Sequence, residues 1–336
     1  MNNLSKTETI SPADALQSEA FDEFGFHTEP FESDAERLAA SRLPPAKRQW
    51  MVERLLVKYA VFKQGYQMIA ENHRPVIGGT QGKGVIAAVI GASHTGKTRI
   101  CEYYLSMHPP RYDDEGEIVP VIHMTATDKM KPEEFARQLN GLTIARQPRS
   151  GRGGIDAFVD QALYQLLRAR TELLIIDDAQ YLFLNQTKGG AGAMYKVVKK
   201  IADFKKLTIM LVGEGALNDY AYAVPSFKNR QYNWLPLQGL GSGEADMERY
   251  AGLLRGIDRR LPFANLSGLD SPLLIEDLYR FSDGMVGRLM NLIRPAAFRA
   301  FNDGSSHILI EHLRHVVATR LAPDDSHNYF GYRHAA

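Results

Sequence analysis

The chain has 336 residues, of which 44% are hydrophobic, and 40 Lys and Arg residues nearly balance 39 Asp and Glu residues. This length and apolar content exclude a wholly disordered chain and are enough for one large core, or for a core domain with a smaller one. A net charge of +1 excludes a surface that is basic throughout, so any contact with nucleic acid must be local.

The single cysteine, Cys101, excludes an internal disulfide and fits a reducing compartment. The apolar runs are strand-sized, well below the roughly 20 residues of a membrane-spanning helix. The opening residues MNNLSKTETISPADALQ lack the basic flank and apolar block of a secretion signal. We therefore expect a cytoplasmic protein with no membrane partner.

Residues 1–43 are expected to form an acidic, flexible arm. Eight acidic residues up to position 34 are balanced by Lys6 alone, with Phe21, Phe24, Phe26 and Phe31 scattered among them. The alternative is a solvated leader with no role of its own.

A helix and then alternating strands and helices are expected in residues 44–239. Apolar residues at three- and four-residue spacings predict one amphipathic helix from Pro45 to the residues before Pro75. Five apolar segments then predict strands at 85–90, 118–124, 173–177, 208–213 and 232–237. Helical patterns separate them at 98–107, 132–139, 156–168 and 193–204. Apolar strands alternating with helices predict an α/β domain with a parallel sheet covered on both faces.

The strands stop after Gly239. Helical patterns at 245–257, 272–281, 286–302 and 310–320 predict a small helical lid domain over residues 240–321. The polar and aromatic segment 322–336 is expected to be a flexible tail.

A phosphate-binding loop is predicted at residues 91–98, GASHTGKT, which match G-x-x-x-x-G-K-[ST] between an apolar strand and a helix. The glycines let backbone N–H groups point at phosphate oxygens, and the helix adds the positive end of its dipole. Lys97 is expected to reach the β- and γ-phosphates and the Thr98 hydroxyl to bind Mg²⁺. The predicted ATP-binding residues are Gly91, Ala92, Ser93, His94, Thr95, Gly96, Lys97, Thr98 and Arg99.

Two acids end the third predicted strand, LLIIDD. We expect Asp177 to hold Mg²⁺ through water and Asp178 to orient the water that attacks ATP. The alternative is a buried strand that ends at the surface in two acids without a catalytic role.

Two arginines are predicted to contact the γ-phosphate. Arg230 lies between the last two strands, where it could reach the nucleotide of a neighbouring subunit, and Arg288 lies at the start of a lid helix. Glu214, after the fourth strand, is a further candidate γ-phosphate sensor. The alternative for each arginine is a solvated surface position.

These motifs in order resemble the AAA+ regulators of Tn7-like transposition, the TnsC or TniB family. The resemblance covers residues from about 44 to 320 and depends on GASHTGKT, LLIIDDAQYL, TIMLVGEGAL, SFKNRQYNWLPL and DGMVGRL. It implies an AAA+ P-loop ATPase fold, in which a five-stranded parallel sheet with flanking helices precedes a helical lid. It also implies a prokaryotic protein that binds ATP and Mg²⁺ and assembles with itself as a ring or helical filament on duplex DNA. The implied partners are a transposase and a target-selector protein, and hydrolysis disassembles the complex.

Carried over by motif, the resemblance makes Lys97, Asp178, Arg230 and Arg288 the catalytic residues. The family's usual acid pair is Asp-Glu, whereas this chain has Asp177 and Asp178. Because aspartate is one methylene shorter, we predict slow hydrolysis and a long-lived ATP state.

The resemblance also implies DNA contacts on the rim of a ring, made to the phosphate backbone with little sequence preference. A solvated turn is the alternative for the first four candidates. The predicted DNA-contacting residues are Thr125, Thr127, Lys129, Lys131, Arg149 and Arg152.

Two other functions use the same ATP site. A protein-remodelling ATPase would need an aromatic pore loop, whereas TATDKMK is polar and basic. A phosphotransferase would need an acceptor pocket and a short lid, whereas this chain has a separate helical region. These two functions remain the alternatives to a DNA-bound assembly.

Overall fold

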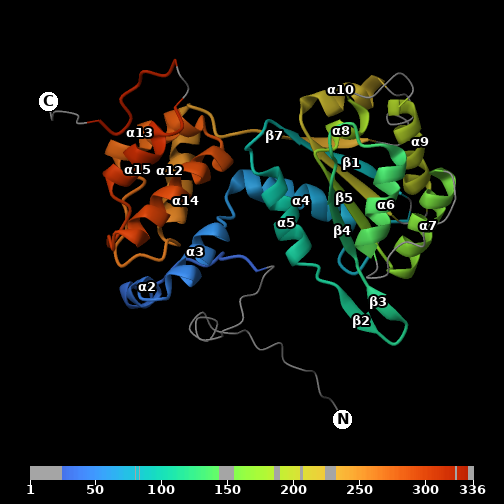
Figure 1. Ribbon diagram of the computed structural model, residues 1–336, viewed down its shortest axis with the longest axis horizontal. Coiled ribbons are helices and arrows are strands. Elements are labelled where there is room, and N and C mark those ends of the chain that lie inside the picture. Colours follow the sequence, from blue (N-terminus) through green and yellow to red (C-terminus); the bar gives the residue numbers. More distant parts are fainter. Residues whose placement is uncertain are drawn as a thin grey trace, which may run out of the picture. The chain divides into compact units, whose positions relative to one another are not determined.

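A computed structural model describes residues 25–79, 81–82, 84–143, 155–184, 190–204, 207–223, 232–321 and 324–331. The chain divides into two compact units (Figure 1). The sheet unit comprises Lys58–Asp246 and Ser282–Leu289, and the helical unit comprises Met1–Val57, Met247–Phe281 and Met290–Ala336. The helical unit thus combines residues from both ends of the chain, whereas the sequence placed the domain boundaries at 43/44 and 239/240.

The sheet unit is built on five parallel strands, as predicted, and the structure gives their order as β4-β5-β6-β1-β7. Their bounds are β1 Ile86–Gly91, β4 Val121–Thr125, β5 Leu173–Asp177, β6 Thr208–Gly213 and β7 Asn233–Leu237. Every residue of β5 and β6 is buried, which is why these strands read as unbroken apolar runs. The order places the ends of β1, β5 and β6 side by side at one edge of the sheet.

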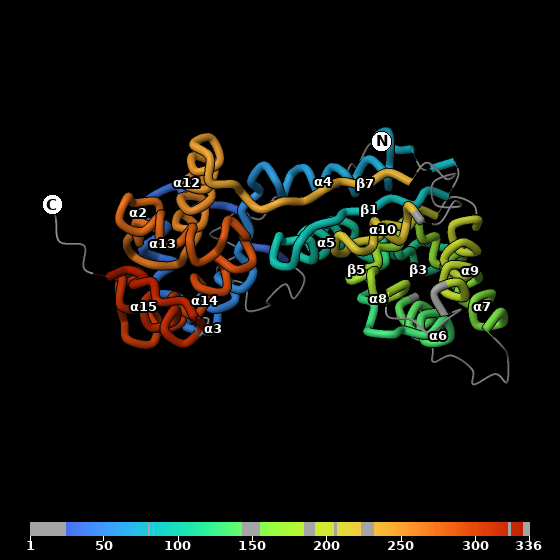
Figure 2. The backbone as a smooth tube through the Cα atoms, turned by 90° about the horizontal axis from the view of Figure 1, so that it is seen from above, coloured from blue at the N-terminus to red at the C-terminus, as the bar shows by residue number. Residues whose placement is uncertain are grey.

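Helices cover both faces of this sheet (Figure 2). On one face, β1 residues Ile86, Ala88 and Ile90 share a core with α6–α10. On the other face α4 packs against α5, and Gly65 lets them approach, because a Cβ there would lie 2.6 Å from a methyl of Ile100. The helix bounds are α4 Ala60–His73, α5 Lys97–Ser106, α6 Pro132–Thr143, α7 Ile155–Arg168, α8 Gln180–Phe183, α9 Gly190–Asp203 and α10 Gly215–Ala223.

The predicted single helix over residues 45–74 is wrong. The structure has α3 (Pro45–Glu53) and α4, separated by an extended segment. Leu55 forms a parallel bridge with His27, whose N–H donates to the Arg54 carbonyl at 3.0 Å while its carbonyl accepts from Leu56 N–H at 3.0 Å. This pairing with a distant segment outweighs the helical pattern.

The second predicted strand also begins later than expected, at Val121. The residues before it form a small hairpin, β2 (Arg111–Asp113) and β3 (Gly116–Ile118), that projects from the sheet unit (Figure 1). Arg170 holds the hairpin through two hydrogen bonds of 2.6 Å to Asp113.

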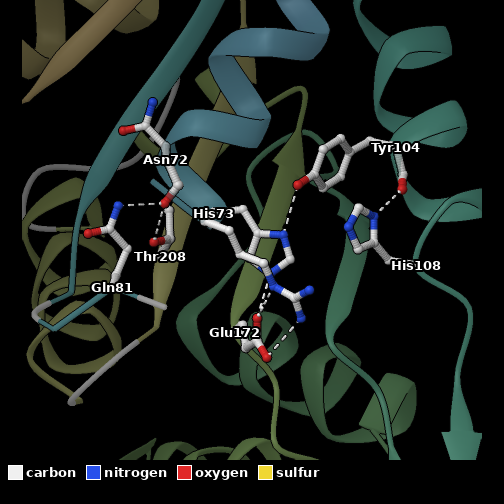
Figure 3. Close-up of polar contacts among 8 residues, drawn as sticks. Asn72, His73, Gln81, Tyr104, His108, Glu172 and Thr208 are labelled. Atoms are coloured by element: carbon white, nitrogen blue, oxygen red, sulfur yellow. Dashed lines mark hydrogen bonds and ion pairs between the residues drawn. The ribbon is translucent and has the colours of Figure 1, made fainter. Parts of the chain in front are cut away.

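A buried polar cluster lies at the edge of the sheet where β5 and β6 begin (Figure 3). His73 at the end of α4 hydrogen-bonds the Tyr104 hydroxyl of α5 at 2.8 Å and the Glu172 carboxylate before β5 at 3.0 Å. Arg74 donates twice to the same carboxylate, at 2.8 and 3.1 Å. Burial lowers the pKa of His73 to about 4, although Glu172 opposes the shift. His73 is therefore neutral at pH 7.

The helical unit contains α2 (Asp34–Ser41), α3 and α15 (Ile310–Ala318), together with most of α12 (Glu244–Asp258), α13 (Pro272–Ser282) and α14 (Val286–Asn302). The described part of the predicted flexible arm is packed here rather than loose. Phe31 and Ala40 are buried, and the Arg37 guanidinium lies 5.8 Å from the Phe31 ring. Ser33 caps α2 by accepting from Glu36 N–H, so the predicted arm contains a helix that the sequence analysis did not expect. No helix in the described residues is long and apolar enough to cross a membrane.

The tail prediction is wrong for residues 324–331, which pack on the helical unit. Phe330 is 3% exposed, and its N–H donates to the buried Asp277 carboxylate at 2.7 Å. His327 contacts the other oxygen of Asp277 at 2.8 Å, and Arg314 donates to the Phe330 carbonyl at 2.5 Å. Two buried aromatic rings and a shared buried carboxylate hold this segment in place.

Candidate nucleotide-binding site

The loop between β1 and α5 has a tightly curled backbone with two residues in the left-handed conformation. His94 and Gly96 have left-handed φ angles of 67° and 95°, and the Thr95 hydroxyl donates to the Ala92 carbonyl at 2.9 Å. Gly91 packs against β7, since a Cβ there would lie 2.3 Å from the Leu237 carbonyl oxygen. The loop therefore leads into the start of α5, where the first N–H groups have no acceptor within the helix.

Lys97, the first residue of α5, is buried against this loop. Its Nζ donates to the Gly91 and Ala92 carbonyls at 2.7 and 2.8 Å. Burial lowers the pKa of Lys97, and nearby negative charges oppose that shift. The carboxylates that oppose it are those of Asp177, Glu214 and Asp178. The ammonium group is thus held where the ends of three adjacent strands meet.

Asp177 ends β5 and is buried. Burial raises its pKa, but His123, the Thr98 hydroxyl and the Asp178 backbone N–H outweigh that effect and lower the pKa overall. Asp178 N–H donates to Oδ1 at 2.9 Å, and His123 Nε2 lies 3.8 Å from Oδ2, beyond hydrogen-bond range. An ionised carboxylate beside a threonine hydroxyl fits Mg²⁺, which takes one or two protein oxygens and completes its shell with water and phosphate.

Asp178 occupies a tight turn after β5. Its φ is 52°, a left-handed conformation that aspartate tolerates better than most residues. Ala179 N–H fastens the turn to β6 by donating to the Val212 carbonyl at 2.9 Å. The carboxylate of Asp178 is half-buried beside the end of β6.

The start of α14 touches the loop within the sheet unit. Gly287 N–H donates to the His94 carbonyl at 2.8 Å, and a Cβ at Gly287 would lie 2.7 Å from the same oxygen. The preceding turn needs Gly284, whose φ is 66° and whose Cβ would lie 1.9 Å from the Leu240 carbonyl oxygen. Arg288 therefore follows directly on a residue that contacts the loop, with its side chain 47% exposed and 4.0 Å from Asp283.

Comparisons with known proteins agree with this geometry. Residues 80–220 match the family model described as AAA domain. Among curated proteins, none matches this chain in sequence.

Three archaeal structures illustrate the similarity in fold. The Aeropyrum pernix Orc1 protein in complex with DNA is 16% identical, with a TM-score of 0.54 over 77% of this chain and 64% of that protein. The A. pernix Orc2 protein with ADPNP and ADP is 12% identical, with a TM-score of 0.52 over 76% of this chain and 66% of that one. Pyrobaculum aerophilum Cdc6p is 16% identical, with a TM-score of 0.53 over 77% of this chain and 67% of that protein.

The chain has an AAA+ P-loop ATPase fold. It spans less than two thirds of the length of the two Orc proteins above. In this chain the phosphate loop lies in the sheet unit, and helices follow the last strand in the sequence.

The structure places some predicted residues together and leaves others undescribed. Residues 91–98, Asp177, Asp178 and the start of α14 converge on one edge of the sheet, while Arg99 pairs with Glu102 at 2.9 Å. Arg230, Arg149 and Arg152 lie outside the described residues.

The predicted DNA segment follows β4 at the same edge as the phosphate loop. Thr125, Thr127, Lys129 and Lys131 are exposed, and Lys129 has a φ of 57°. An open groove of about 700 Å³ lies beside them, lined by Thr127, Lys131, Glu133, Glu134, Arg137 and Gln138. Two cations and two carboxylates share this groove, so its charge is less positive than TATDKMK alone suggests.

Three residues near the site carried no role in the sequence analysis: His123, Gln180 and Gly287. The sequence signal for Gly287 was present, since it directly precedes the predicted Arg288. Gln180 lies in the LLIIDDAQYL motif that supports the resemblance, but the motif alone gave it no role. His123 had no sequence signal, because its contact with Asp177 depends on β4 and β5 lying next to each other.

Proposed function

We propose that this protein is an ATPase of the TnsC or TniB type, which assembles with itself on duplex DNA when ATP is bound. Bound ATP and Mg²⁺ supply the γ-phosphoryl group and a metal ion that neutralises its charge. Lys97 and the loop N–H groups would hold the phosphates, and Thr98 and Asp177 would hold the metal. Asp178 orients the attacking water.

The single observation that carries the proposal is the contact between α14 and the phosphate loop. Gly287 N–H donates to the His94 carbonyl at 2.8 Å, so a movement of the phosphate loop would displace the start of α14, which carries Arg288. Arginine suits this place, since a guanidinium binds phosphate oxygens in pairs and never loses its charge near pH 7. A site of this kind can report nucleotide occupancy, which an assembly switch requires.

Self-assembly requires a residue from a neighbouring copy at the same nucleotide. We assign this role to Arg230. An arginine supplied in trans can accelerate hydrolysis by about 10³–10⁵-fold. Such head-to-tail contacts generate rings when the rotation closes and helical filaments when it does not. We propose that a transposase and a target-selector protein bind the assembled form.

DNA is proposed to lie against the exposed segment after β4. Support comes from its lysines and from the fold shared with a DNA-bound Orc1 protein. The neighbouring Glu133 and Glu134 would repel phosphate, so Lys129 and Lys131 carry most of the attraction. This arrangement favours contacts with the DNA backbone over reading of bases.

The experiment is a titration of duplex DNA by fluorescence anisotropy, with and without ATP and over a range of salt concentrations. We expect tight binding only with ATP, and Lys129→Ala with Lys131→Ala should reduce the salt slope by about one unit for each lost phosphate contact. Lys196→Ala with Lys199→Ala, on the exposed face of α9, is the matched control and should leave the slope unchanged. Binding that is equally tight without ATP, or ³²P passed from ATP to a small acceptor, contradicts the proposal.

A further inference from the structure

Gln180 is a buried polar side chain beside the nucleotide site to which the proposed chemistry gives no task. It is the first residue of α8, two residues after Asp178, and is 7% exposed. A buried amide is stabilised only if its donor and acceptor find partners, so its contacts show what it is fixed to.

The two ends of this amide reach two different strand ends. Nε2 donates to Oδ1 of Asp178 at 3.3 Å, at the long end of the hydrogen-bond range, and Oε1 accepts from the backbone N–H of Glu214 at 3.2 Å. Asp178 follows β5 and Glu214 follows β6. One side chain therefore bridges the acid proposed to orient water and the residue after the neighbouring strand.

The position of the amide is tightly restricted. A Cβ on Gly213 would lie 2.4 Å from Oε1, so the absence of a side chain there makes the room that the amide occupies. The hydrogen bond from Ala179 to Val212 fixes the backbone on the same two strands. The bridge therefore belongs to the packed sheet and not to a freely rotating surface side chain.

We infer that Gln180 is a positioning residue that holds the Asp178 carboxylate and the Glu214 backbone in one fixed arrangement for hydrolysis. This role rests on the proposed function of Asp178. A misplacement of about 1 Å in a catalytic group can cost about 10²-fold in rate, so a restraint on the carboxylate affects turnover more than nucleotide affinity. Because Gln180 contacts neither the loop nor Lys97, ATP binding should not depend on it.

Two substitutions separate the two contacts. Gln180→Glu keeps an acceptor for Glu214 N–H but loses the donor to Asp178, whereas Gln180→Ala loses both. Gly213→Ala perturbs the bridge from the opposite side and leaves every polar side chain of the site in place. Gln67→Ala is the control, because Gln67 is exposed on α4 and hydrogen-bonds only Glu71 among the described residues.

The test measures phosphate release, affinity for a fluorescent ATP analogue, and amide hydrogen exchange at Glu214 without nucleotide. All three site variants should lose about 10-fold or more in kcat with unchanged nucleotide affinity. Exchange at Glu214 should accelerate in Gln180→Ala and stay slow in Gln180→Glu. This pattern distinguishes positioning from a general loss of folding, which would raise exchange and weaken nucleotide binding together.

Two different failures can be told apart. If the wild type hydrolyses ATP and the Gln180 variants match it, or if affinity falls as much as kcat, the role of Gln180 is overturned and the proposed function stands. If the wild type binds ATP but shows no turnover, the proposed function fails and this role fails with it.

Discussion

At the scale of single residues, the site combines one buried lysine with three carboxylates. Lys97 lies among Asp177, Asp178 and Glu214, and its ammonium rests on two loop carbonyls. These carbonyl contacts are ones that phosphate oxygens can replace, because phosphate is the stronger acceptor. The site is therefore prepared for an anion that arrives with a divalent cation.

The first prediction concerns Asp178. Asp178→Asn keeps the size of the side chain but removes the charge that would draw a proton from water. We expect phosphate release to fall by about 10²-fold or more, with ATP affinity retained. Assemblies on DNA should consequently last longer with ATP.

Phosphate release and dissociation from DNA after ATP removal measure this effect. Asp219→Asn, an exposed change on α10, is the control. Phosphate release at the wild-type rate in Asp178→Asn would show that another group orients the water.

At the scale of elements, the His73 cluster ties α4, α5 and the start of β5 together (Figure 3). The His73 pKa of about 4 lies below the ordinary 6.5, so between these values the unfolded chain binds more protons than the folded one. The free energy of unfolding should therefore fall as pH falls from about 6.5 to about 4. The pKa of Glu172 is also lowered, so protonation of Glu172 further reduces the free energy of unfolding at lower pH.

Urea denaturation across this pH range tests the cluster. His73→Gln should make the free energy of unfolding less dependent on pH. Part of the dependence should remain in this variant, because burial also lowers the pKa of His27 to about 4. His315→Gln on the exposed face of α15 should change nothing. A slope in His73→Gln as steep as in the wild type would exclude His73 as a source of the dependence.

The packed end of the chain gives a second element-scale prediction. Removing residues 324–336 takes away the hydrogen bonds that His327 and the Phe330 N–H make to Asp277, whose side chain is 3% exposed. We expect the helical unit to lose about 1–3 kcal/mol of stability.

Limited proteolysis with urea measures this loss in the helical unit alone, which avoids assuming a single transition for two units. Removal of residues 332–336 only is the control, because it leaves His327 and Phe330 in place. Equal resistance of the two truncated chains would contradict the account.

Local patterns predicted the elements of the sheet unit well, and distant contacts explain the errors. The five strands and most helices follow from apolar runs and periodicity, and the phosphate loop follows from its motif. The break between α3 and α4 could not be predicted, because it depends on pairing with His27, and the tail depends on the buried Asp277. Gln180 was missed because its partners at Asp178 and Glu214 meet only when β5 and β6 are neighbours.

At the scale of the whole molecule, the chain has an AAA+ fold. The proposed assembly on DNA connects the nucleotide site to a function. An ATP-controlled contact between copies needs the nucleotide to be held by one copy and sensed by the next, as proposed for Lys97 and Arg230. If that contact repeats regularly, the copies form a ring or a helical filament that can enclose or follow a DNA duplex.

The decisive measurement is electron microscopy of the protein with duplex DNA and a non-hydrolysable ATP analogue. We expect regular rings or filaments on DNA with the analogue, and none without nucleotide or with Lys97→Ala. The same assemblies in the absence of nucleotide, or with Lys97→Ala, would contradict it.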